Sequence, residues 1–292
     1  MHGLFIGLTT LDLIYLAENP PVRNQKLVAS DYTAAAGGPA TNAAVAFGAL
    51  GGQASLLSVV GCHPMTQLIG ADLQQCGVSL RDLDPAWAEL PPMSSIIVTE
   101  ATGDRAVISI NAAKLQATPA QLPADILQGV DVVLLDGHQM AVGFAIAEQA
   151  KALNIPVVLD GGSWKPGLEA VLPFVNYAIC SANFHPPNCD TQADIVAYLT
   201  HLSIAQIAIT HGEQPIWYTN SRRDSFTNRA QTGYLPVPKI KPVDTLGAGD
   251  IFHGAFCHFI LQTNFVEALA RSAEIAARSC LHFGTRQWLK EE

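Results

Sequence analysis

Short apolar runs alternate along the chain with alanine-rich stretches of helical length. The runs are mostly apolar, which is typical of strands that are buried on both faces of a parallel sheet. They lie at 3–8, 56–60, 132–135, 157–159, 178–180 and 207–210. Helices are predicted between them, at 39–50, before Gly77, at 143–153 and at 191–202. The alternation predicts an α/β fold in which helices cover both faces of a mostly parallel sheet.

The ends of two helical regions are also marked. Pro39 stands at the first position of the first helix, and Gly51 follows the end of that helix. The last third of the chain, at 250–283, predicts two consecutive helices.

Two stretches break this pattern. Residues 12–36 are polar and irregular, and residues 94–110 alternate between apolar and polar positions around Gly103, which indicates a hairpin. Two interpretations remain open from the pattern alone. The stretches are either β insertions, at about 13–36 and 93–111, that form a small lid over one end of the sheet, or ordinary surface loops.

The composition excludes several classes of protein. Of the 292 residues, 49% are hydrophobic and 14% are charged, as in a globular chain with a large core. The formal net charge is −9, and an acidic chain is a poor partner for nucleic acid. We see no secretory signal and no apolar run near the ~20 residues of a membrane span. We therefore expect a cytoplasmic protein with reduced cysteines and no nucleic-acid or membrane partner, since none of its six cysteines forms a Cys-x-x-Cys pair.

The segment at 243–252 is the strongest candidate for chemistry. It is rich in glycine and other small residues, and an amphipathic helical stretch follows it. The backbone amides at a helix start are unpaired and attract anions, and Gly247 and Gly249 allow a phosphate to approach the backbone. Asp250 falls in the first helical turn. There it either accepts the proton of an attacking hydroxyl or only complements the helix dipole.

Two further positions could contact a ligand. Gly37 and Gly38 precede the first helix, and Asn42 offers a donor and an acceptor within it. Asp12 follows the first strand, at the edge where open α/β sheets bind ligands. The alternatives are a tight turn before a capped helix and a solvated loop acid. A Walker-type phosphate loop, a Gly-x-Gly-x-x-Gly fingerprint and a Gly-x-Ser-x-Gly elbow are all absent from the sequence.

Taken together, these motifs resemble the PfkB carbohydrate kinase family, also called the ribokinase family. Gly37-Gly38-x-x-x-Asn42 resembles its first signature, and Asp244-Thr245-x-Gly247-Ala248-Gly249-Asp250 resembles its second. The resemblance covers the whole chain, 1–292. It implies one ribokinase-like domain, a three-layer α/β/α sandwich with a small β-sheet lid, that transfers a phosphoryl group from ATP to a hydroxyl.

The resemblance also implies roles for individual residues. Asp250 stands at the position of the family's catalytic base. The family's anion hole corresponds to Gly247, Ala248 and Gly249, and its acceptor-binding positions correspond to Asp12, Gly38, Asn42 and Arg105. Its nucleotide-binding positions correspond to Asn183, Thr210, Gly212, Ala277, Cys280 and Gly284. The implied cofactors are ATP and Mg²⁺, with a monovalent cation as a further candidate.

Two residues depart from the family's pattern. Pro186 stands where the Asn-x-x-Glu motif has its glutamate, and Pro215 stands where a glycine is expected. The first change predicts weak magnesium affinity, and we assign no metal ligands. Neither change touches Asp250 or its glycines.

The acceptor is predicted to be neutral. Parts of the chain resemble the bacterial sulfofructose kinases, and the region around Asp12 resembles ketohexokinases. Relatives that take anionic sugars carry an arginine where this chain has His138, which is mostly uncharged at neutral pH when unperturbed. We therefore expect a ketose or a pentose. The alternatives are a nucleoside kinase, a sugar-phosphate or sulfosugar kinase, and a non-catalytic ligand-sensing relative. The edges of a β lid also favour a homodimer.

Overall fold

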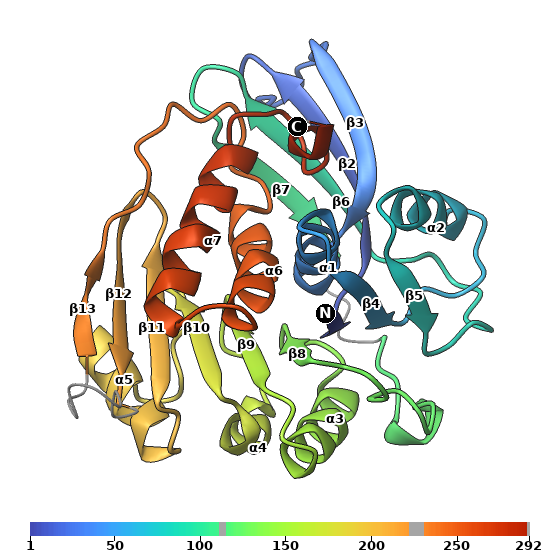
Figure 1. Ribbon diagram of the computed structural model, residues 1–292. Helices are drawn as coiled ribbons and strands as arrows, with labels where there is room; N and C mark the ends of the chain where they lie inside the picture. Colours follow the sequence, from blue (N-terminus) through green and yellow to red (C-terminus); the bar gives the residue numbers. More distant parts are fainter. Residues whose placement is uncertain (111–114, 222–230, 291–292) are drawn as a thin grey trace.

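The computed structural model describes residues 1–110, 115–221 and 231–290, and its main feature is a large sheet. In this part of the chain the strand order is β13-β12-β11-β10-β9-β8-β1-β4-β5 (Figure 1). The strands from β5 to β11 are parallel, and β12 and β13 are antiparallel additions at one edge. The bounds are β1 His2–Ile6, β4 Gln53–Ser58, β5 Ser79–Asp82, β8 Val132–Leu135, β9 Val157–Gly161, β10 Tyr177–Ser181, β11 Gln206–His211, β12 Gln214–Asn220 and β13 Gln231–Leu235.

Helices cover both faces of this sheet, as the apolar runs predict. Successive side chains of a strand point to opposite faces, so Leu134 of β8 joins one core cluster and Leu135 joins the other. One cluster packs under α1 Pro39–Ala49, α2 Thr66–Gln75, α6 Ala248–Ile260 and α7 Phe265–Ser279. The other packs under α3 Met140–Ala152, α4 Leu168–Val171 and α5 Gln192–His201. Short 3₁₀ helices lie at Pro119–Gln121, Leu172–Phe174 and Gln287–Lys290.

The two stretches that break the α/β pattern form a second, four-stranded sheet. Its order is β3-β2-β6-β7, with β2 at Thr10–Ala17, β3 at Asp31–Gly37, β6 at Met93–Thr99 and β7 at Arg105–Ser109 (Figure 1). Strands β6 and β7 pair as the predicted antiparallel hairpin around Gly103. The predicted sandwich with a small β lid is therefore confirmed. No helix among the described residues is long and apolar enough to cross a membrane.

The structure differs from the sequence interpretation in two places. Asp12 was predicted to follow the first strand, with the lid insertion beginning at about residue 13, but it is already the third residue of lid strand β2. The edge strands β12 and β13 were not predicted. Their side chains are largely exposed or half-buried, so the sequence lacks the apolar run that marks the central strands.

Close packing of α1 against α6 brings the two sequence motifs together. A side chain at Gly254 of α6 would overlap the backbone carbonyl of Ala43 in α1. The glycine on one helix and the alanines on the other therefore allow the backbones to approach closely. As a result, Asn42 near the start of α1 lies beside Asp250 in the first turn of α6.

Candidate active site

The first turn of α6 has the geometry of an anion site. Gly247 precedes the helix with a φ of 71°, in the left-handed region that favours glycine. A Cβ at Gly249 would meet no atom within 4 Å, so that glycine borders open space rather than packed protein. The helix amides and dipole favour negative charge here.

Asp250 lies beside that space and is only partly exposed. The Nδ2 atom of Asn42 donates a hydrogen bond of 2.9 Å to Oδ2 of Asp250. Burial and the neighbouring charge of Asp160 raise the pKa of Asp250 to about 7, against the opposing effect of the Asn42 hydrogen bond. A carboxylate with a pKa in this range can accept a proton near neutral pH.

A buried acid and a histidine lie behind Asp250. His253 Nδ1 is 2.7 Å from the carbonyl oxygen of Gly249, and Nε2 is 3.1 Å from that of Ile179. The carboxylate of Asp160, at the end of β9, lies 3.3 Å from Nδ1. Burial raises the pKa of Asp160, although the charge of His253 opposes this shift.

Asp12 faces the body of the protein from the lid. Its Oδ1 accepts a hydrogen bond of 2.7 Å from Thr10, and a side chain at Gly37 would overlap its carboxylate. Burial raises the pKa of Asp12. Gly38 has a φ of 98°, and a side chain there would overlap the carbonyl of Leu8. The glycine pair therefore lets the end of β3 pass close to these groups.

His138 is bound to an acid at the end of β8. Its Nδ1 lies 3.1 Å from Oδ1 of Asp136, whose oxygens also accept from the backbone amides of Leu8, Ala40 and His138. Burial alone would raise the pKa of Asp136, but the charge and side-chain hydrogen bond of His138, together with the Leu8 amide and the charge of Lys165, lower it. Lys165 donates a 3.0 Å bond to the carbonyl oxygen of Asp136.

Arg105 connects the lid to the segment that leads into α6. Its Nη1 donates to Oγ1 of Thr245 at 2.9 Å, and Thr245 Oγ1 donates to the Gly103 carbonyl at 3.2 Å. The lid hairpin thus rests on the residues just before the glycines of the anion site.

The predicted nucleotide residues fall into two groups. Asn183 follows β10, Thr210 lies near the end of the neighbouring β11, and Gly212 follows β11. The second group lies at the end of α7: Ala277 is within that helix, Cys280 caps it, and Gly284 follows. The Asp244 side chain accepts from the Gly284 amide at 2.8 Å, which ties this second group to the start of the anion site.

Comparison with known proteins decides the family. The family model described as pfkB family carbohydrate kinase matches the chain over residues 3–291. The chain belongs to the pfkB carbohydrate kinase family. It is therefore a phosphotransferase whose acceptor is a hydroxyl group of a carbohydrate.

Curated relatives and solved structures agree with that family. The ribokinase of Bacillus subtilis (strain 168) is 25% identical over 287 residues, which cover 96% of this kinase and 93% of the relative. The deoxyribokinase of Salmonella typhi is 25% identical, with coverage of 93% and 90%. The structure of Arabidopsis thaliana ribokinase complexed with ribose and ATP is 19% identical, covers 100% and 99%, and has a TM-score of 0.75. The similarity to this last structure shows a shared fold.

Among the described residues of the kinase, no group of three or more His, Cys, Asp or Glu could hold a metal ion. Pro186, in place of the expected glutamate, removes one acid from the loop after β10.

Sequence reasoning missed four titratable residues of the candidate site. Asp160 could have been found, because it ends a predicted strand as Asp136 does. Lys165 and His253 carry no motif of their own. Arg286 lies after α7 and contacts Asn42 from 244 positions away, so no local pattern points to it.

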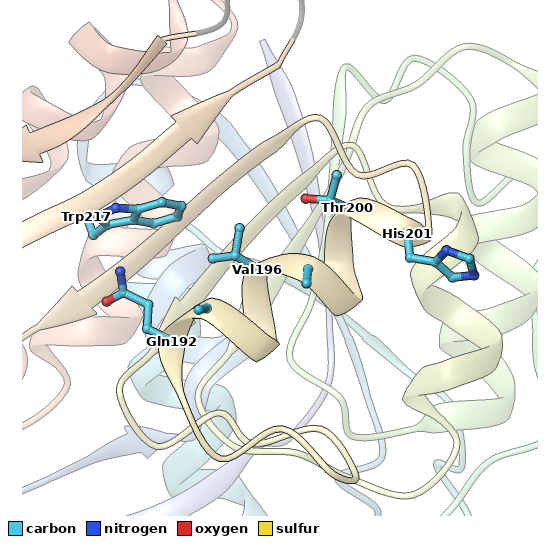
Figure 2. A pocket seen from close by; sticks show the side chains of 7 residues that line it. Gln192, Val196, Thr200, His201 and Trp217 are labelled. Atoms are coloured by element: carbon cyan, nitrogen blue, oxygen red, sulfur yellow. The ribbon is translucent and has the colours of Figure 1, made fainter.

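Two cavities lie outside the candidate active site. One, of about 680 Å³, is an open groove between α5 and β12, and Figure 2 shows Trp217 and Gln192 along it. None of its lining residues is among the predicted site residues. The other, of about 190 Å³, lies between lid strands β2 and β3 and helix α2.

Proposed function

We propose that this kinase transfers the γ-phosphoryl group of ATP to a hydroxyl of a neutral monosaccharide, with Asp250 as the general base. The observation that carries this proposal is the open space over Gly249, directly beside Asp250 in the first turn of α6. A transferred phosphoryl group fits against the helix amides there, within reach of the carboxylate.

The chain's own residues have separate tasks in this reaction. Asp250 takes the proton of the attacking hydroxyl, and the amides of the Gly247-Ala248-Gly249 turn stabilise charge on the phosphoryl group. ATP arrives as its magnesium complex, which neutralises the triphosphate. Asp12 accepts hydrogen bonds from acceptor hydroxyls.

The nucleotide would lie along the two groups described above. We assign its phosphates to Thr210, Gly212 and Asn183, and its adenine to Ala277, Cys280 and Gly284. A monovalent cation remains a candidate activator for which no described residue is assigned. A cytoplasmic location is likewise part of the proposal.

The charges around the acceptor side favour a neutral sugar. Asp12, Asp136 and Asp250 place three acids there. The basic side chains nearby are engaged: His138 lies against Asp136, and Lys165 donates to a carbonyl oxygen. An anionic head group would meet these acids without a free arginine fork to bind it. Relatives named ribokinase and deoxyribokinase favour a pentose, with a ketose as the second candidate.

A panel of acceptors tests this proposal. Release of ADP is measured with ribose, 2-deoxyribose, fructose, fructose 6-phosphate, sulfofructose and a nucleoside, and the rate without acceptor is subtracted. We expect kcat/KM for a neutral sugar to exceed that for either anionic sugar by about tenfold or more. A preference for an anionic sugar or for the nucleoside would overturn the assignment of the acceptor. A lack of turnover with every acceptor would count against catalysis itself.

A further inference from the structure

We propose that Arg286 is the positioning residue of the catalytic base, because it holds the Asn42 side chain in the orientation that donates to Asp250. The inference rests on the proposed role of Asp250 and goes beyond it, since Arg286 belongs to no motif of the site. It lies between α7 and the last 3₁₀ helix, Gln287–Lys290.

The orientation of the Asn42 amide follows from its two neighbours. Nη1 of Arg286 donates to Oδ1 of Asn42 at 3.0 Å, while Nδ2 of Asn42 donates to Asp250 at 2.9 Å. A guanidinium only donates, and an ionised carboxylate only accepts. A flipped amide would set its NH₂ group against the guanidinium and its oxygen against the carboxylate. Arg286 therefore fixes which end of Asn42 faces the base.

The same guanidinium also holds the end of lid strand β3. Nη2 donates to the Ala36 carbonyl at 2.5 Å, and Nη2 and Nε donate to Oδ2 of Asp72 at 3.1 and 3.2 Å. Oδ2 of Asp72 in turn accepts from the Ala36 amide at 3.0 Å. Both backbone groups of Ala36 are thus fixed, one residue before Gly37. Arg286 connects the base to the glycine pair that passes Asp12.

The C-terminal segment that carries Arg286 is itself anchored. Trp288 is 2% exposed, and its indole donates to the Thr285 carbonyl at 3.1 Å. Nη1 of Arg286 also donates to the Thr285 carbonyl and hydroxyl. The side chain of Arg286 is 15% exposed, so little water competes for its donors. The guanidinium donates to four residues at once, namely Asn42, Ala36, Asp72 and Thr285, and a lysine has no matching planar geometry.

Two functions of Arg286 must be separated by experiment, because it also neutralises Asp72. Arg286→Gln leaves Asp72 without its cation and is expected to lower stability. The double variant Arg286→Gln/Asp72→Asn removes both charges together and is expected to regain most of the thermal stability. If Arg286 positions the base, kcat of the double variant stays below that of the parent enzyme, by up to about 100-fold, because misplacing a catalytic group can lower the rate that much. Compared with Arg286→Gln, Arg286→Lys is expected to regain stability but only part of the lost kcat.

A double-mutant cycle with Asn42 gives the decisive measurement. In an Asn42→Ala background, adding Arg286→Gln/Asp72→Asn should lower kcat little further, because the residue that transmits the effect is already gone. KM for ATP should change little throughout. In Arg286→Gln/Asp72→Asn, the acidic limb of the kcat/KM profile should also move to higher pH, because the hydrogen bond that favours ionised Asp250 is weakened. The other charged groups near Asp250, namely Asp136 of β8, Asp160 of β9 and His253 of α6, are unchanged in these variants.

Near-normal kcat in the folded double variant, or fully additive losses of kcat in the cycle, would overturn the positioning role. Asp250→Asn is measured in parallel. Near-normal turnover in that variant would reject the base assignment, whereas a large loss there with normal turnover in the Arg286 variants would reject only the present inference.

Discussion

Two features of the surroundings of Asp250 shift its pKa in opposite directions. It is held in a desolvated setting near Asp160, which favours the neutral acid, and it accepts a hydrogen bond from Asn42, which favours the anion. The outcome is a raised pKa of about 7 rather than a permanently charged group. A base with this property is basic enough to take a hydroxyl proton and is still ionised in a large share of molecules at neutral pH.

Asp250→Asn tests the chemical role directly. The amide keeps the shape of the side chain and can still accept from Asn42, but it cannot take a proton. We expect kcat to fall by at least ~100-fold, the lower end of general-base contributions, with nucleotide affinity retained. Turnover and ATP binding are measured separately, by ADP release and by titration calorimetry. Loss of nucleotide binding together with turnover would indicate a role in binding instead.

The pH dependence of stability offers a second test at the same residue. The folded-state pKa of Asp250 is raised above its unfolded value, so its favourable contribution is present at low pH and is lost as pH rises through about 7. Asp250→Asn has no such loss. We therefore expect its Tm to exceed that of the parent above pH 7 and to approach it near pH 4. In the parent, kcat/KM should fall as pH drops below about 7, because the base becomes protonated.

Asp125→Asn is the matched control for the stability measurement. Asp125 is exposed, so the same loss of one charge should leave the difference in Tm nearly independent of pH. An equal gain for both variants above pH 7 would point to net charge rather than to the site.

Among the elements, the start of α6 contributes most to the proposed function. Its first turn supplies the amides, its glycines supply the space, and its packing on α1 supplies Asn42. The side-chain position of Gly249 is open, unlike that of Gly254, where a side chain would overlap Ala43. The two glycines therefore serve different purposes: one leaves room for a ligand, and the other leaves room for a helix.

Gly249→Val tests that distinction. A Cβ at this position would meet no atom within 4 Å, so we expect the fold to persist, but the valine side chain would occupy the space assigned to the phosphoryl group. We expect turnover to be lost while Tm changes by little more than in Gly70→Val. Gly70 is a suitable control because it is also helical, and a Cβ added there would likewise meet no atom within 4 Å. Full activity of Gly249→Val would mean that phosphate binds elsewhere.

The elements also show what the sequence can and cannot predict. Central strands such as β8 were recognisable because burial on both faces makes the whole run apolar. Strand β12 was missed because its side chains are mostly half-buried at a sheet edge. Asp250 and its glycines lie within one short motif and could be proposed together. The contact of Arg286 with Asn42 arises only when the chain folds, so no local signal exists for it.

At the scale of the whole molecule, the lid has one face toward the body and one face toward solvent. Asp12 and Ile14 of β2 are buried on the inner face, whereas Tyr15 points the other way. Across the strands, Tyr15 pairs in register with Tyr32 of β3, and Ile108 of β7 belongs to the same outer face. Tyr32 and Ile108 are 77% and 76% exposed. The outer face of the lid therefore exposes apolar side chains from both of its edge strands.

A second copy of this chain is the partner we expect on that face. The lid sheet ends at β3 and β7, whose outer edges pair with no described strand, and apolar edges of this kind favour association. We predict a homodimer that Ile108→Asp converts to a monomer, because a charge in an apolar contact is costly to bury. Sedimentation equilibrium over a range of concentrations measures the mass of each species. Leu153→Asp is the matched control: Leu153 is 59% exposed, but it follows α3, away from the lid. A monomeric parent protein, or equal dissociation by both substitutions, would contradict a dimer through the lid, whereas a monomer from Ile108→Asp alone with folding retained would support it.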